Sequence, residues 1–175
     1  MSIIKVISEE TNSILSLDEI KNFLRIDFND DDVLLQKALN TVTRQCELKI
    51  GQTLNPKTYL MSIYNPLTSD KIKLKCEPII SVEKIEHVDD NEITTIIPTA
   101  NYRVNQDLSL IKFLNVPTNF YKLDITYKAG YITVPDDLKQ GLLFHIAKIY
   151  EDKTGFYPIP KASNNIYKFY QKIKF

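Results

Sequence analysis

The chain has 175 residues, a formal net charge of +0, a mean hydropathy of −0.20 and 25% charged residues. Such a composition is that of an ordinary globular domain, long enough to bury roughly 70% of the surface its unfolded form exposes. The balanced charge argues against electrostatic binding to the nucleic-acid backbone, because such binding normally needs a basic domain. No segment approaches the ~18 apolar residues of a membrane span. We also expect no signal peptide, since Glu9 and Glu10 interrupt the N-terminal apolar run.

Two helices are predicted in the first third of the chain, over about 16–25 and 30–50. Ser16 and Glu19 have the spacing of a capping box, in which each side chain bonds the other residue's backbone N–H. Asn29 is the expected N-cap of the second helix. Gly51 lies where a helix commonly ends in a left-handed glycine. Between these ends the apolar residues follow the 3.6-residue period.

From about 58 to 128 the apolar period changes to two residues. Charged and apolar side chains alternate most clearly over 71–77 and 121–128, as in strands with one face in water. Turn signals separate weaker predicted strands at 58–64, 82–88, 93–97, 101–104 and 108–114. Short, evenly spaced strands indicate an antiparallel sheet inserted between helices.

A third helix is predicted over 135–152, because Pro135 suits a first helical turn and two acids follow it. The sequence therefore predicts an α+β fold. We expect one domain over 1–153, with its β insertion at about 56–132. A proline-punctuated linker and an aromatic, basic tail would follow over 154–175.

The acidic run at 27–32 invites comparison with a calcium-binding loop, but its spacing is wrong. Asp32 stands where that loop needs glycine, and Ala38 where it needs a bidentate Glu. Acids that favour a helix start are the better interpretation. Cys46 and Cys76 are interpreted as reduced, buried thiols, and we expect no metal site.

No residue pattern indicates catalysis. The chain has no G-x-S-x-G elbow and no glycine-rich phosphate loop, and a packed His145 is favoured over a catalytic base. His87 has no ligand at metal-binding spacing. We therefore expect no catalytic residues, no cofactor and no enzymatic activity.

Charge is distributed unevenly along the chain. Residues 9–32 hold eight acidic and two basic side chains, a net charge of −6, whereas residues 153–175 hold five lysines and no acid. Two oppositely charged segments of this kind can join copies of the chain head to tail. Alternatively, the basic segment can dock on an acidic partner. Ordinary solvated surfaces are the alternative.

The C-terminal tail interleaves apolar and aromatic residues with lysines. Three interpretations stay open for it: a docking surface for a partner, packing on its own domain, and nucleic-acid binding. The residues concerned are Ile166, Tyr167, Lys168, Phe169, Tyr170 and Lys172.

Four segments share an order and spacing: 16–27 with the acidic run and long helix that follow, 72–85 with Pro78 between two strands, Asn-Tyr-Arg-Val at 101–104, and 125–135. In the last, Tyr-Lys-Ala-Gly-Tyr precedes Val-Pro and a helix. Over roughly residues 16–153 this pattern resembles the head–tail connector (adaptor, or head-completion) proteins of tailed bacteriophages and gene-transfer particles.

The resemblance implies a structural virion protein at the head–tail junction, assembled in the host cytoplasm. It implies a ring, usually of twelve copies, beneath the portal. Such a ring extends the DNA channel, lets DNA pass without specific binding, and offers a platform to a stopper or tail-completion protein.

Two docking hypotheses follow. The tail residues Ile166, Tyr167, Lys168, Phe169, Tyr170 and Lys172 would dock on the portal or a neighbouring subunit, and Asp30, Asp31 and Asp32 would form a subunit interface or line the channel. The alternative function is a nucleic-acid-binding accessory protein that uses the basic aromatic tail.

Overall fold

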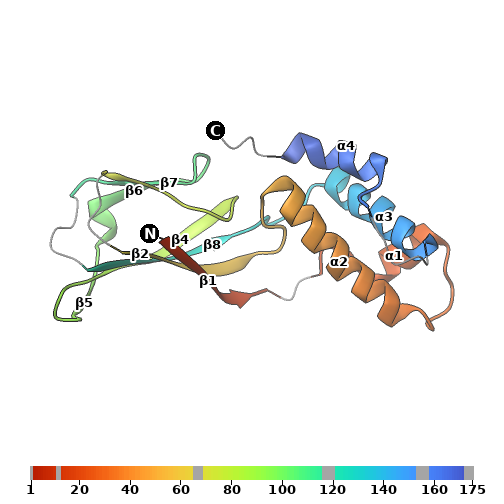
Figure 1. Ribbon diagram of the computed structural model, residues 1–175, viewed down its shortest axis with the longest axis horizontal. Coiled ribbons are helices and arrows are strands. Elements are labelled where there is room, and N and C mark those ends of the chain that lie inside the picture. Colours follow the sequence, from red (N-terminus) through yellow and green to blue (C-terminus); the bar gives the residue numbers. More distant parts are fainter. Residues whose placement is uncertain (1, 11–12, 65–68, 116–120, 153–157, 172–175) are drawn as a thin grey trace. The chain divides into compact units, whose positions relative to one another are not determined.

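The computed structural model describes residues 2–10, 13–64, 69–115, 121–152 and 158–171. Within these ranges it contains four α-helices and two antiparallel sheets, which confirms the predicted α+β class (Figure 1). The chain divides into two compact units: residues 1–11 and 55–132 form the β unit, and residues 12–54 and 133–175 form the helical unit. The predicted domain boundary near residue 153 stays a prediction. The segment beyond it contributes a helix to the helical unit.

The β unit is a sandwich of two sheets, with β6 and β7 above β2, β4 and β8 in Figure 1. Its larger sheet has the strand order β1-β2-β8-β4-β5 and its smaller sheet the order β3-β7-β6. Side chains from both sheets form one apolar core, to which β8 contributes Leu123, Ile125 and Tyr127 at every second position. The strands are β1 (Ser2–Glu9), β2 (Lys57–Tyr64), β3 (Lys71–Lys73), β4 (Ile79–Val88), β5 (Thr94–Ile96), β6 (Tyr102–Asn105), β7 (Leu110–Phe113) and β8 (Lys122–Ala129).

Strand β1 was not predicted from the sequence. It forms an edge of the larger sheet, paired only with β2 among the described residues. Ile4 packs against the core, while Ile3, Val6 and Ile7 are exposed. Because apolar side chains occupy both faces of this strand, its sequence lacks the alternation that revealed the other strands.

The strand predicted over 71–77 ends early, at Lys73. Its charged and apolar residues still alternate, but Cys76 has a left-handed backbone with φ of 61°, which no extended strand can contain. The carbonyl of Lys75 instead accepts a hydrogen bond from the hydroxyl of Tyr127 at 2.5 Å. Side-chain alternation alone therefore overestimated the length of this strand.

Gly130 follows β8 at a tight crossing of two chain segments. Its φ is +134°, and its N–H donates to the carbonyl of Pro78 at 2.8 Å. A Cβ at this position would lie 2.6 Å from the carbonyl oxygen of Asn55. Only glycine fits both the conformation and the space.

The helical unit comprises α1 (Leu17–Leu24), α2 (Asp32–Ile50), α3 (Asp136–Glu151) and α4 (Lys161–Tyr170). The predicted capping box is confirmed: the Ser16 N–H donates to Glu19 at 2.6 Å, and the Glu19 N–H donates to the Ser16 hydroxyl at 3.1 Å. These bonds lower the pKa of Glu19. Gly51 ends α2 in the predicted left-handed conformation, with φ of 72°.

The predicted cap at Asn29 is wrong. Helix α2 begins at Asp32, so Asp31 is its N-cap, and the Asp31 side chain makes no capping hydrogen bond. The Asn29 side chain instead accepts a hydrogen bond from the Lys21 ammonium at 2.5 Å. A longer loop between α1 and α2 thus replaces the first residues of the predicted helix.

His145 lies on the buried face of α3 and is fully inaccessible to solvent, as a packed histidine would be. Its Nδ1 lies 3.5 Å from the hydroxyl of Tyr167, while its Nε2 has no hydrogen-bond partner among the described residues. Burial disfavours the charged imidazolium and lowers the pKa of His145 to about 4. The helical unit therefore packs around a neutral histidine.

Replacing Gly130 with alanine should destabilise the β unit by roughly 3 kcal/mol, because the added methyl group meets backbone atoms and the conformation is strained. Gly51→Ala is the matched control. That position also has a positive φ, but nothing lies within 4 Å of an added Cβ, so we expect a loss of about 1 kcal/mol. Chemical denaturation of both variants measures the difference, and equal losses would contradict the steric argument.

The free energy of unfolding should fall as the pH drops from about 6.5 to about 4. In that pH range His145 is protonated in the unfolded chain and neutral in the folded chain. The resulting loss in the free energy of unfolding is about 3 kcal/mol, at ~1.4 kcal/mol per pKa unit. His145→Gln removes this contribution and leaves the carboxylates in place. The free energy of unfolding of the wild type should therefore fall relative to that of the variant as the pH is lowered, and a difference between the two that stays constant across pH would refute the prediction.

Candidate functional site

Both sets of predicted docking residues lie in the helical unit. Asp30, Asp31 and Asp32 stand at the start of α2, and the tail residues from Ile166 to Tyr170 lie on α4. Lys172 lies outside the described residues. The candidate site can therefore be described on one compact body.

Tyr167 belongs to the core of the helical unit rather than to its surface. It is fully buried, and burial raises the pKa of its hydroxyl. A Cβ on Gly141 of α3 would lie 2.9 Å from its ring, so the absence of a side chain there makes room for the tyrosine. Of the interpretations left open for the tail, packing on its own unit holds for this residue.

Tyr170 ties the end of α4 to two other elements. Its hydroxyl donates to the Asp137 carboxylate in the first turn of α3 at 2.5 Å. Its carbonyl accepts a hydrogen bond from the Gln52 side chain, two residues beyond α2, at 2.6 Å. Tyr170 is thus a positioning residue, and like Ile166 it is only partly accessible.

Lys168 and Phe169 provide the outward surface of α4. The side chain of Phe169 is 88% exposed, the largest value among the exposed large apolar residues of the described chain. Lys168 beside it is also exposed. Fewer of the predicted tail residues are therefore available to a partner than the sequence suggested: among the described ones, Phe169 and Lys168 are exposed.

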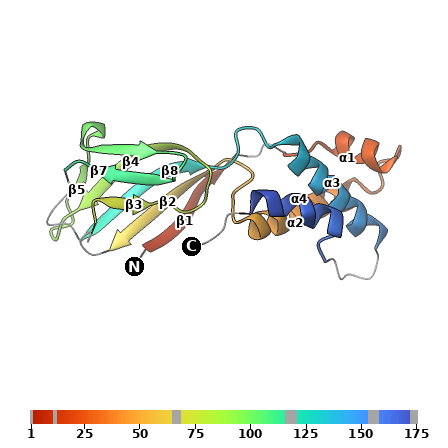
Figure 2. The ribbon, with the colours of Figure 1, turned by 90° about the horizontal axis from the view of Figure 1, so that it is seen from above.

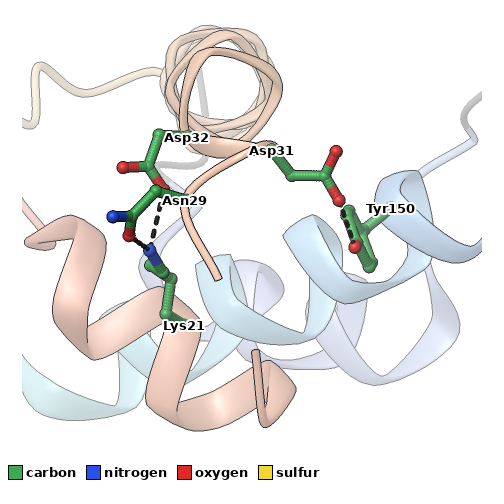
Figure 3. Close-up of polar contacts among 5 residues, drawn as sticks. All are labelled: Lys21, Asn29, Asp31, Asp32 and Tyr150. Atoms are coloured by element: carbon green, nitrogen blue, oxygen red, sulfur yellow. Dashed lines mark hydrogen bonds and ion pairs between the residues drawn. The ribbon is translucent and has the colours of Figure 1, made fainter. Parts of the chain in front are cut away.

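The three aspartates are not equivalent (Figure 3). Asp32 pairs with the Lys21 ammonium of α1 at 2.9 Å, and Asp31 accepts a hydrogen bond from the hydroxyl of Tyr150 on α3 at 2.5 Å. This bond raises the pKa of Tyr150. Asp30 is exposed, and its side chain makes no hydrogen bond or ion pair with the described residues. Two of the three aspartates thus hold helices together, and Asp30 presents its charge to solvent.

The acidic loop and the end of α4 lie at opposite ends of α2. Asp31 precedes the helix, and Gln52, which bonds Tyr170, follows it. The 19 residues of α2 span about 28 Å at 1.5 Å per residue. The acidic loop and the last turn of α4, which includes Lys168, are therefore separated in space within the helical unit.

One exposed aromatic pair was missed by sequence reasoning. Phe23 of α1 and Phe144 of α3 meet edge to face, with ring centroids 5.9 Å apart, and each side chain is 37% exposed. Since Phe144 is about 120 residues away in the chain, no local pattern could have paired them.

In the described part of the chain, no three His, Cys, Asp or Glu side chains gather as metal ligands do, and no helix is long and apolar enough to cross a membrane. Neither cysteine forms a disulfide. Cys46 is buried, which raises the pKa of its thiol to about 12, whereas Cys76 is only partly buried, contrary to expectation.

Three solved structures share this fold over nearly the whole chain. One is a chain from the neck of an empty gene transfer agent (GTA) particle computed with C6 symmetry (TM-score 0.79, 16% identity, 99% of this chain and 97% of that one). The second comes from the virion of a native GTA particle (0.80, 16%, 99% and 97%). The third comes from the neck of a native GTA particle computed with C12 symmetry (0.75, 18%, 98% and 97%).

No curated protein matches the chain. The model of one protein family, described as "Head completion protein", matches residues 13–154 of the chain. This range begins three residues before Ser16, the N-cap of α1, and ends three residues after α3. That range includes the whole β insertion and most of the helical unit. The match confirms the resemblance seen in the sequence and the structural class of protein that it implied: the chain belongs to the head completion protein family.

Proposed function

We propose that this chain is a structural subunit of the neck of a tailed, phage-like particle. Copies of it would form a ring beneath the portal, extend the DNA channel and offer a platform to a stopper or tail-completion protein. The observation that carries the proposal is the agreement of fold over 99% of this chain and 97% of a chain from the neck of a GTA particle. Membership of the head completion family supports the same role.

A ring is supported by the symmetry of the similar necks, which are described with C6 and C12 symmetry. A closed ring needs a head-to-tail contact between two different patches of each copy. The helical unit offers two such patches, because the acidic loop before α2 and the last turn of α4, which includes Lys168, lie at opposite ends of that helix. We propose twelve copies in the virion.

The proposed role needs no catalysis and no cofactor. Family members and similar folds are structural virion components. DNA would pass through the ring without specific binding, which agrees with the formal net charge of +0. The proposed location is the head–tail junction, with assembly in the host cytoplasm.

Co-expression with the portal protein of the same particle tests the proposal. Native mass spectrometry of the purified complex should show one portal ring carrying a ring of this chain, with a mass that fits twelve copies. The wild-type chain should stay in the complex during size-exclusion chromatography. A chain that never associates with the portal or with any other neck component would refute the proposed function.

Reversing the charge of Asp30 should weaken ring assembly if the acidic end meets the basic end of a neighbour. Asp30→Lys is the clean variant, because Asp31 and Asp32 also hold helices within the subunit. We expect the variant to fold normally and to need a several-fold higher concentration to assemble. The matched control is Asp107→Lys, which makes the same charge change at an exposed position of the β unit. Equal assembly by both variants would exclude the acidic end from the interface.

Truncating the tail would be a poor test of docking. Deleting residues 164–175 removes Tyr167 from the core of the helical unit, so lost attachment would reflect misfolding. Substitutions on the outward face of α4 avoid this problem.

A further inference from the structure

The outward face of α4 carries a large aromatic side chain, Phe169, that the described residues of its own subunit leave exposed. Ser163 and Tyr167, four residues apart, form the buried face of this helix, and Phe169 lies on the opposite side. An aromatic ring that is 88% exposed gains free energy when a partner buries it. Phe169 therefore has the properties of an interface anchor.

The aromatic pair of Phe23 and Phe144 is a matching acceptor. Two rings in edge-to-face contact, each 37% exposed, leave a shallow apolar surface between α1 and α3. A third ring can add to such a pair with the same edge-to-face or offset geometry. The surface lies on the same unit as Phe169 but on different helices.

Charge complementarity favours a second copy of this chain as the occupant. Residues 17–32, which contain α1 and the loop after it, hold six acidic and two basic side chains, a net charge of −4. The α4 segment over 158–171 holds Lys161 and Lys168 and no acid. A basic helix that carries an exposed phenylalanine thus complements, in charge, an acidic surface that contains an aromatic pair.

The two surfaces lie on opposite sides of the helix pair α2 and α3. Helix α1 packs on that pair, and so does α4, and Figures 1 and 2 both show α1 and α4 apart, with α3 between them. The Phe169 of one copy is therefore placed to meet another copy's aromatic pair and not its own. Two different patches on opposite sides make a head-to-tail contact, which closes into a ring when the rotation allows it.

We propose that Phe169, flanked by Lys168, inserts against Phe23 and Phe144 of the neighbouring subunit and forms the aromatic anchor of the ring interface. This inference rests on the proposed function, because it assumes that copies of the chain assemble. It assigns the contact to a second copy rather than to the portal.

Photo-crosslinking tests which molecule meets Phe169. The chain with p-benzoylphenylalanine in place of Phe169 is mixed with ¹⁵N-labelled wild-type chain, assembled with the portal and irradiated. Mass spectrometry should find cross-links from position 169 to labelled peptides that contain Phe23 or Phe144. The same substitution at Leu48, which is 66% exposed on α2, is the matched control and should not produce them.

Cross-links from position 169 to the portal, to the same chain or to other peptides of the neighbour would overturn the inference and leave the proposed function standing. Failure of the wild-type chain to assemble with the portal would instead refute the proposed function.

A double-mutant cycle gives a quantitative test. Phe169→Ala and Phe144→Ala should each raise the concentration needed for half-maximal assembly at least tenfold, while Leu48→Ala leaves it unchanged. Because both phenylalanines act in one contact, the double variant should be little worse than either single variant. Circular dichroism confirms that each variant is folded. Fully multiplicative losses, or no loss in Phe169→Ala, would contradict a direct contact.

Discussion

The helical unit depends on the burial of Tyr167. Helix α4 has ten residues, and Ser163 and Tyr167 are its only buried ones, so the tyrosine carries most of the apolar contact that holds α4 in place. Gly141 provides the space for the ring, and His145 lies beside its hydroxyl. Once Tyr167 is seated, the opposite face of α4 must point outward. The exposure of Phe169 and Lys168 therefore follows from how the core is packed.

The contacts at the acidic loop have a comparable role. Lys21 joins α1 to Asn29 and Asp32, while Tyr150 joins the end of α3 to Asp31. The three adjacent aspartates therefore have two different roles: Asp31 and Asp32 bond neighbouring helices, and Asp30 contributes charge to the surface. The acidic surface open to a partner therefore consists of carboxylates, such as that of Asp30, that make no contact holding the helices together.

Local signals predicted much of this structure. The capping box at Ser16, the glycine at the end of α2 and the alternation along β8 are all encoded within a few residues, and each is confirmed. Features that depend on residues distant in the chain were not predicted. Strand β1 has apolar residues on both faces and is defined by its pairing with β2, and Phe23 contacts Phe144 only in the folded chain. The burial of Tyr167 was accessible in principle, because Ser163, Tyr167 and Tyr170 follow a helical period. Interleaved lysines concealed that pattern in a segment interpreted as a tail.

The path of the chain also has a consequence for how the protein is made. The β unit needs residues 1–11 and 55–132, so all of its strands are synthesised before α3. Helices α1 and α2 emerge between the first and second strands, yet they pack on α3 and α4, which come last. Since domains fold as units during synthesis, the sandwich can form while the first two helices still lack their partners. The surfaces proposed for assembly are therefore completed only after α4 has emerged from the ribosome, which delays self-association until the whole helical unit can fold.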